Sequence, residues 1–582
     1  MTKQDFDNRI DAGKHQEQEL QKVYNKIVHL RVIIGLLLIY FLYKSINTQL
    51  TIYVVMAGAG VLAFLALVIW HGLIKRDIAV VKLYQKINDE YISRLYDNWQ
   101  AFEDGGIDLA APTHPYAFDL DIIGEASLYK KISVANTFLG REKLADYLLN
   151  REQSVSVREY RQKAINELSN NIDFVQQLQV ILRQNKTVRE NPNKWINIAS
   201  QKIPLPNVID ILAPAFPIIV IGLFIIGKVT NSSLVIIVAF AFALVAAGLR
   251  LFIPVDLSIL RTVRYQLEPY IEVFSLLDKT DFKSEYLLNK KKQLDGILEG
   301  LSKLEHIATL ATFSQQPLFA IPLNGIFMWD FWIAKMCIQW QRNFGFNIQE
   351  ALNLVAEIEA LASLTTLSFL EELHYALIDK PKQIIAKDIG HPLICKEKRV
   401  TNDFSLKNEI FIITGSNMSG KTTFLRTIGI NLVMAYAGAP VCAKSLQCCA
   451  LDIYTSMRIG DNLGQNTSTF HAEITRMQLI LEAKDKGILF LMDEIFRGTN
   501  SNDRISGAKS VIYALKRAGA IGAITTHDLE MCVLGDEEGI SNYHFTDLFE
   551  NEKMYFDYKL KTGIATKTNA KYLMEMIGLE ID

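Results

Sequence analysis

Long apolar stretches, grouped in two pairs, dominate the hydrophobic pattern of this chain. A membrane-spanning helix needs about 20 apolar residues, with roughly 17 to 25 workable. The first pair is separated by the short polar turn NTQLT and the second only by Lys228, so the pattern predicts two transmembrane helical hairpins. The apolar stretches are residues 30–46 and 52–74 in the first pair, and residues 211–227 and 229–249 in the second.

The first apolar stretch is the shortest of the set. Only residues 32–43 lie between Arg31 and Lys44. This stretch spans a bilayer only if both basic side chains snorkel to the interfaces. The alternative for it is a buried or interfacial helix.

Basic residues lie mainly outside the hairpins. Each connecting turn carries one lysine, Lys44 or Lys228, whereas the flanks carry several basic residues. The positive-inside rule then predicts an integral membrane protein, as in a bacterial-type inner membrane, with both termini and the middle segment in the cytoplasm. The flanking residues are Lys22, Lys26, Arg31, Lys75, Arg76, Lys82, Lys194, Lys202, Arg250, Arg261 and Arg264.

The rest of the chain divides by periodicity into a helical part and a C-terminal α/β part. Segments such as VREYRQKAINELSNNIDFVQQLQVILRQN repeat apolar residues with a period near 3.6, which is typical of amphipathic helices. We expect a multidomain α and α/β protein. Its predicted parts are a polar helix at 1–29, a hairpin at 30–76, a linker at 77–115, a helical domain at 116–385 interrupted by the second hairpin at 208–253, and an α/β domain at 386–582.

A glycine-flanked lysine stands between a predicted strand and a predicted helix. The segment GSNMSGKTT, residues 415–423, has the spacing G-x-x-x-x-G-K-[ST] in the strand-to-helix context that a phosphate loop requires. Its backbone N–H groups, the helix N-terminus and Lys421 predict a site for ATP. The residues of the loop are Gly415, Ser416, Asn417, Met418, Ser419, Gly420, Lys421, Thr422 and Thr423.

Two later predicted strands end in polar side chains. GILFLMDE ends in Asp493 and Glu494, and AIGAITTHD ends near His527. With Thr422, the first carboxylate is expected to hold Mg²⁺, and the second to orient and deprotonate the attacking water. His527 is suited to sense or polarise the γ-phosphate. The set favours ATP hydrolysis over binding alone.

Composition narrows the class of protein further. The 582 residues exceed the roughly 250 to 300 at which a single core stops growing, so several domains are expected. The net charge of −2 shows no global basic excess for nucleic acid. The six cysteines form no C-x-x-C pair, which indicates neither a disulfide framework nor a zinc site.

The ordered motifs resemble the ATPase domain of the MutS family, the mismatch-repair branch of the ABC-type ATPases. They are GSNMSGKTTFLRTIG, SMRIGDNLGQNTSTFHAEITRMQLIL, FLMDEIFRGTNSNDRISGA and ITTHD, preceded by GHPLI with Asn402-Asp403 and followed by YKLKTGIATKTNAKYLMEMIGL. Upstream, FDLDIIGEASLYKKISVANTFLGREKLADYLLN and EIEALASLTTLSF are similar to the start and end of the helical core domain of that family. The resemblance covers roughly residues 116–200 and 300–582.

The resemblance implies a two-fold dimer in which each ATP lies between one subunit's phosphate loop and the other's signature segment. In that segment Ser468 matches the serine that acts in trans. Three features depart from the family pattern. Asn466-Thr467 replaces Gly-Arg, the acidic loop is shorter, and Phe496 replaces a glycine. Without the family, Ser468 would read as a helix N-cap.

Two classes of function fit the sequence. One is a membrane-anchored ATPase that closes as a dimeric clamp on DNA. The other couples the same ATPase to a protein partner or to the membrane segments, with no DNA role. Mismatch reading is not expected, because a membrane hairpin stands where the recognition domain would be. The single Phe-x-Glu sequence, Phe369-Leu370-Glu371, lies in a predicted amphipathic helix, where Phe369 should be packed.

Overall fold

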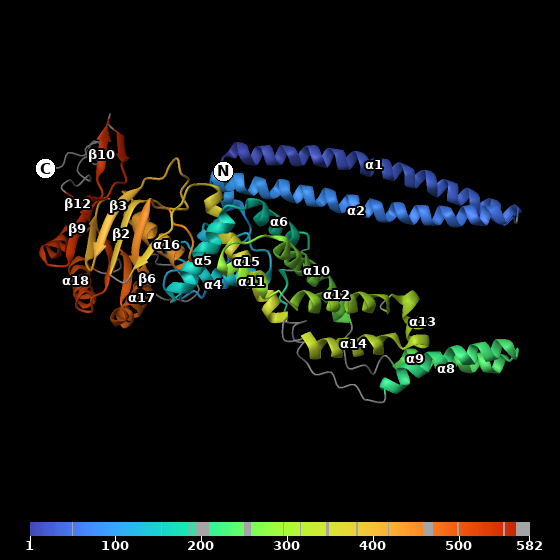
Figure 1. Ribbon diagram of the computed structural model, residues 1–582. Helices are drawn as coiled ribbons and strands as arrows, with labels where there is room; N and C mark the ends of the chain where they lie inside the picture. The colour runs from blue at the N-terminus through green and yellow to red at the C-terminus, as the bar shows by residue number, and fades with distance from the viewer. Residues whose placement is uncertain are drawn as a thin grey trace.

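The molecule is elongated, with an α/β part at one end and two helical hairpins that project in the same direction at the other (Figure 1). This computed structural model describes residues 1–565 with gaps at 49, 153, 186–188, 193–208, 250–257, 295, 315, 345–347, 380–381, 417, 458–468, 497–499 and 551–552. The described part is mostly helical, and its strands lie in the C-terminal third of the chain.

The first hairpin consists of α1 (Lys3–Thr48) and α2 (Thr51–Leu95). The predicted polar helix and first apolar stretch form one 46-residue helix, so the predicted boundary at residue 29 falls inside α1. Helix α2 likewise continues to Leu95, through much of the predicted linker at 77–115. The reason is that both polar segments keep a helical pattern and pair with each other along their length.

The paired polar ends of α1 and α2, residues 3–29 and 75–95, are called the stalk here. Phe6 stacks on Tyr91 at its base, with ring centroids 5.3 Å apart. Tyr91 in turn meets the edge of Phe369. Phe369 is buried, which confirms the prediction that it is packed. It lies in the 3₁₀ turn η6 (Thr366–Phe369) that follows α15, however, and not in the predicted amphipathic helix.

Beyond the stalk, α1 and α2 are long and apolar enough to cross a membrane by length and composition. Only 6% and 11% of their most apolar windows are buried, whereas the core helix of a soluble protein would be mostly covered. The two charges that limit the first stretch lie against aromatic rings, Arg31 over Phe64 and Lys44 over Tyr40.

The second hairpin consists of α8 (Ile209–Val229) and α9 (Ser233–Leu249). These helices are apolar and exposed, but they are shorter than α1 and α2, and α8 contains Pro214 and Pro217. The second pair is therefore the one whose helices are barely long enough to span a membrane. The sequence had predicted this limit for the first apolar stretch. At 17 residues, α9 is at the lower end of what can span.

The helical domain packs around α4 (Phe138–Leu149) and α15 (Ile348–Leu364), which lie against each other. Its remaining helices are α3 (Leu128–Ile132), α5 (Val155–Ser169), α6 (Ile172–Arg183), α10 (Ser258–Lys279), α11 (Glu285–Lys292), α12 (Ile297–Ser314), α13 (Pro317–Phe327) and α14 (Trp329–Phe344).

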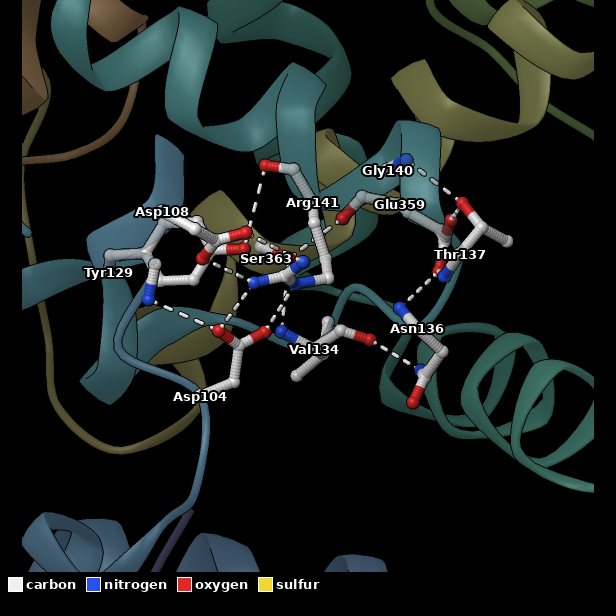
Figure 2. A network of polar contacts seen from close by, with 11 residues as sticks. Asp104, Asp108, Tyr129, Val134, Asn136, Thr137, Gly140, Arg141, Glu359 and Ser363 are labelled. Atoms are coloured by element: carbon white, nitrogen blue, oxygen red, sulfur yellow. Dashed lines mark hydrogen bonds and ion pairs between the residues drawn. The ribbon is translucent and has the colours of Figure 1, made fainter. Parts of the chain in front are cut away.

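A buried carboxylate joins α4 to α15, as Figure 2 shows. Glu359 on α15 accepts hydrogen bonds from the backbone N–H groups of Asn136 (2.6 Å) and Thr137 (3.2 Å), and from the Thr137 hydroxyl. These groups precede the first turn of α4, whose N–H groups have no partner within the helix. A Cβ at Gly140 would lie 2.2 Å from the Glu359 carboxylate, so only glycine leaves room for this contact.

The α/β part contains a six-stranded sheet of order β12-β9-β4-β8-β7-β6, in which the central strands are parallel. A second sheet has the order β1-β5-β2-β3, and β10 pairs with β11. The strands are β1 (Leu377–Asp379), β2 (Gln383–Ile389), β3 (Asn402–Lys407), β4 (Ile410–Thr414), β5 (Ser445–Cys449), β6 (Asp452–Ser456), β7 (Ile488–Asp493), β8 (Ile521–Thr526), β9 (Ile540–His544), β10 (Asp547–Glu550), β11 (Lys553–Phe556) and β12 (Lys561–Thr562).

The six-stranded sheet lies between two hydrophobic clusters. On one face, Ile410 and Ile412 pack with α17 (Thr469–Ala483) and α18 (Ser501–Arg517). On the other, Phe411 and Ile413 join a cluster that is continuous with the helical domain. Helix α16 (Lys421–Ala437), which is almost wholly buried, lies in that second cluster.

The boundary between the helical and α/β parts lies earlier than predicted. Strand β1 pairs with β5, and β2 begins at Gln383 and pairs with both β3 and β5. The predicted boundary at residue 386 therefore falls inside β2. Sequence resemblance could not show that β1 and β2 belong to the α/β part, because their pairing partner β5 lies far along the chain.

Candidate functional site

A loop with left-handed glycines joins the buried strand β4 to the N-terminus of α16. Gly415 and Gly420 have φ angles of +147° and +103°, where L side chains are rare. The Lys421 ammonium group donates hydrogen bonds to the carbonyl oxygens of Gly415 (2.8 Å) and Ser416 (2.7 Å). The loop thus closes around its own lysine at a helix N-terminus, an arrangement that favours anions.

Asp493, the last residue of β7, connects the loop to the neighbouring strand. The hydroxyl of Thr422 donates to Asp493 Oδ2 at 2.9 Å. The hydroxyl of the buried Thr525, which pairs with Asp493 across β7 and β8, donates to Oδ1. Hydroxyl and carboxylate oxygens held this closely are ligands that a hard divalent cation prefers.

Glu494 follows in a left-handed conformation, with φ of +51°. Such a backbone is uncommon for a residue other than glycine, and it is often found at functional sites. It is held by the Glu494 N–H, which donates to Thr525 O at 3.1 Å. The side chain turns toward His527, whose Nε2 contacts Glu494 Oε1. The carboxylate and imidazole therefore form a pair at the end of adjacent strands.

A cavity of about 650 Å³ opens beside these groups. This volume lies within the usual range of small-molecule sites. One wall consists of loop residues with Asp493 and Glu494, and the other comes from segments that the sequence did not assign to the site. That second wall includes Ile389, His391, Ile394, Lys398, Val400, Asn402, Phe545 and Tyr558.

Asn402 connects two parts of the second wall that lie far apart in the sequence. Its side-chain N–H donates to Tyr558 O at 3.0 Å, and its Oδ1 accepts from Leu560 N at 2.8 Å. The ring of Tyr558 lies against Gly420, where a Cβ would come within 3.0 Å of it. The motifs GHPLI, with Asn402, and YKLKTG marked these segments, but only as parts of a resemblance.

His391 on this wall is neutral at physiological pH. Burial lowers its pKa to about 3, and the nearby cations Arg426, Arg399 and Lys131 contribute to the lowering. Its Nδ1 accepts a hydrogen bond from Leu393 N at 3.3 Å. Apart from Lys398, this wall thus consists of apolar and neutral side chains, whereas the loop and strand ends contribute charged groups.

These residues fit a nucleotide with Mg²⁺. Gly415 and Gly420 leave space that a side chain would fill, since a Cβ at Gly415 would lie 2.9 Å from Phe545 O. The loop contributes the cation Lys421 to the cavity wall, and Thr422 with Asp493 offers oxygen ligands. Apolar and aromatic surface in the same cavity comes from Ile389, Ile394, Val400, Phe545 and Tyr558.

The structure brings most of the predicted site residues together. Ser416, Met418, Gly420, Lys421, Thr422, Thr423, Asp493 and Glu494 line the cavity. Among the described residues, Gly415, Ser419 and His527 lie beside the wall rather than in it. Asn417 and Ser468 lie outside the described residues, so the roles predicted for them remain predictions.

Two residues near the site were given no role from the sequence. Thr525 was quoted only within the motif ITTHD, although it bonds to Asp493. Phe496, noted as a departure from glycine, adopts φ of +61°, and its ring lies against Gly507. A left-handed backbone of this kind is one that glycine adopts without steric cost.

Comparisons with known proteins point to the same region. The family model "MutS domain V" matches residues 411–580. The DNA mismatch repair protein MutS of Bacillus cereus is 30% identical over 242 residues, and so is that of Bacillus mycoides. Each alignment covers 40% of this chain and 27% of the relative, so the chain spans about a quarter of their length. Together, these matches show that the C-terminal part of this chain is similar to MutS domain V.

Proposed function

We propose that this protein is a membrane-anchored, Mg²⁺-dependent ATPase of MutS type that works as a dimeric switch. The observation that carries the proposal is the cavity where Lys421, the Thr422–Asp493 bond and the Glu494–His527 pair meet. The domain V match over residues 411–580 supports it independently.

Different residues of the chain have different roles in hydrolysis. Lys421 and the N-terminus of α16 bind the phosphates, while the second wall with Tyr558 positions the base and sugar. Thr422 and Asp493 hold Mg²⁺, which neutralises phosphate charge when bound. Glu494 orients the attacking water and accepts its proton. His527 fixes the orientation of the Glu494 carboxylate through their contact.

Substitution of the proposed base separates ATP binding from turnover. We expect Glu494→Gln to bind ATP with near-normal affinity and to lose hydrolysis by about 100-fold or more, since general-base catalysis contributes roughly 10²–10⁴. Lys421→Ala should instead weaken binding. Nucleotide binding by equilibrium titration and phosphate release by a coupled assay measure the two effects. Normal turnover by the Glu494→Gln protein would disprove its role as base.

Membrane insertion of both hairpins is the second part of the proposal. It is supported by the exposed apolar surfaces of α1, α2, α8 and α9, and by their common direction (Figure 1). The basic flanks place the ATPase and both termini in the cytoplasm. A homodimer in which Ser468 of one subunit completes the other's site follows from the family resemblance.

DNA is the favoured ligand of the switch, and a protein partner is the alternative. If a basic surface contacts DNA, the affinity for duplex, branched or single-stranded DNA should fall steeply as the salt concentration rises. Absence of binding in every nucleotide state would favour the partner. Because a hairpin and stalk occupy the N-terminal region, duplexes with and without a G·T mismatch should bind alike at fixed salt. A tenfold preference, about 1.4 kcal/mol, would contradict this expectation.

A further inference from the structure

Helix α13 exposes apolar side chains, although it belongs to neither predicted hairpin. Ile321 is 64% exposed, and Phe319 and Phe327 on the same helix are also exposed, as is Phe313 at the end of α12. From Ile307 to Trp329 the sequence contains no charged residue. Contiguous apolar surface of this kind marks a site of interaction rather than ordinary solvent contact.

The polar atoms of α13 turn toward the protein instead. Asn324 is buried, where its side-chain N–H donates to Ala320 O at 3.1 Å and its Oδ1 accepts from Asp330 N at 2.9 Å. The Trp329 indole N–H donates to Leu310 O at 3.0 Å. Asn324, the one polar side chain within α13, and the Trp329 indole at the start of α14 thus face inward while apolar side chains face outward, which is the reverse of a helix on a water-soluble surface.

The position of α13 relates it to the second hairpin. It links the ends of α12 and α14 and runs across the direction of α8 and α9 (Figure 1). Gly325 packs so closely on α9 that a Cβ would lie 2.9 Å from Ala243 O. Just beyond α13, Met328 packs in a cluster with Ala246 of α9.

These contacts set the depth of α13 relative to the hairpin tip. At the rise of an α-helix, Ala243 and Ala246 lie about 15 and 20 Å from Ser233, the first residue of α9. A hydrocarbon core is about 30 Å thick. If the tip reaches the far boundary, α13 lies about 10 to 15 Å inside the near one, and its long axis is parallel to the membrane plane.

We propose that α13 is a membrane-embedded helix that lies in the plane of the bilayer, with its exposed face covered by lipid acyl chains beneath the headgroups of the cytoplasmic leaflet. The inference rests on the proposed insertion of the α8–α9 hairpin, with which its surface is continuous. Buried in this way, α13 ties the helical domain to the bilayer along a plane, whereas the hairpin alone could tilt.

Depth-dependent fluorescence quenching tests this placement in the full-length protein. Cys395 is replaced by serine, because the other five cysteines are buried. Single cysteines at Ile321 on α13, Phe240 on α9 and Tyr160 on α5, all exposed positions, carry an environment-sensitive dye. Each protein enters vesicles of phosphatidylethanolamine and phosphatidylglycerol with added phosphatidylcholine brominated either near the headgroup or near the chain ends. Retained ATPase activity shows that each labelled protein is folded.

We expect the Ile321 dye and the Phe240 dye both to be quenched more by the deep bromines than by the shallow ones, and the Tyr160 dye to be unquenched. An unquenched Ile321 dye with a quenched Phe240 dye would overturn the placement of α13 and leave hairpin insertion intact. If neither dye were quenched, insertion of the second hairpin would fail, and the inference with it. Quenching of the Ile321 dye by the shallow bromines alone would also overturn the derived depth.

Discussion

At the scale of single residues, the site depends on side chains that hold other side chains. Asp493 accepts hydrogen bonds from Thr422 on one oxygen and from Thr525 on the other. Both bonds orient the carboxylate before any ion arrives. Such indirect partners of a metal ligand commonly matter as much as the ligands themselves, because they fix its geometry.

Removal of the Thr525 hydroxyl should therefore weaken Mg²⁺ binding. Thr525→Val keeps the shape of this buried residue but loses the donor to Asp493. We expect the Mg²⁺ concentration for half-maximal ATPase activity to rise by about 10- to 100-fold. Thr525→Ser, which keeps the hydroxyl, is the matched control and should stay near the wild-type value. An unchanged Mg²⁺ dependence of the valine variant would exclude this role.

Glu359 should make stability depend on pH. Burial raises its pKa from 4.5 to about 7 in the folded protein. The stability contributed by this group is therefore complete below about pH 4.5 and is lost as pH rises through about 7. Glu359→Gln should flatten that loss, which amounts to about 3 kcal/mol at most. Thermal midpoints of detergent-solubilised wild type and variant at about pH 5 and pH 8 measure the difference. Parallel profiles would contradict it.

At the scale of elements, the continuous helices α1 and α2 link the apolar hairpin to the helical domain. The base of the stalk is held by the Phe6–Tyr91–Phe369 cluster and by the N-terminal ammonium group of Met1, which donates to Phe369 O at 2.6 Å. Arg9 adds an ion pair with Asp173 at 2.6 Å. An exposed ion pair contributes little, so the aromatic contacts dominate.

Truncation of Phe6 should release the base of the stalk. Phe6 has no exposed surface, and loss of a buried phenylalanine typically costs about 3–5 kcal/mol. We expect Phe6→Ala to raise amide hydrogen exchange in the polar part of α1 and in the segment around Phe369. Phe6→Leu, which fills more of the space, should have a smaller effect. Unchanged exchange in the alanine variant would mean that the stalk is held elsewhere.

At the scale of the whole molecule, the helical domain contacts both the helix that follows the phosphate loop and the residues just before the predicted signature segment. Asp121 pairs with Arg426 on α16 at 3.1 Å. Two residues earlier, Asp119 accepts from Thr455 Oγ1 (2.8 Å) and from Met457 N (3.1 Å), at the point where the chain leaves β6 toward residues 458–468. A short segment of the helical domain thus touches the phosphate-loop helix and the approach to the predicted signature segment.

If two subunits share each ATP site, inactive variants should complement each other. Lys421→Ala removes the phosphate contact in one subunit, and Ser468→Ala removes the predicted contact made in trans. A mixture of the two proteins should recover up to about a quarter of wild-type ATPase activity, since random exchange makes half of the dimers mixed and each keeps one intact site. Subunit exchange is followed by energy transfer between labelled copies. No recovery despite exchange would count against Ser468.

The local pattern of the sequence was enough to predict the loop at 415–423, the strand ends at Asp493 and Glu494, and the apolar hairpins. The spacing of residues within a short motif determines local backbone geometry, and long apolar runs determine which segments must be removed from water. Tertiary structure alone decided the second wall with Asn402 and Tyr558, the Thr525 donor and the Glu359 contact at Gly140. These depend on residues far apart in the chain, whose meeting follows from strand pairing and helix packing rather than from any periodicity.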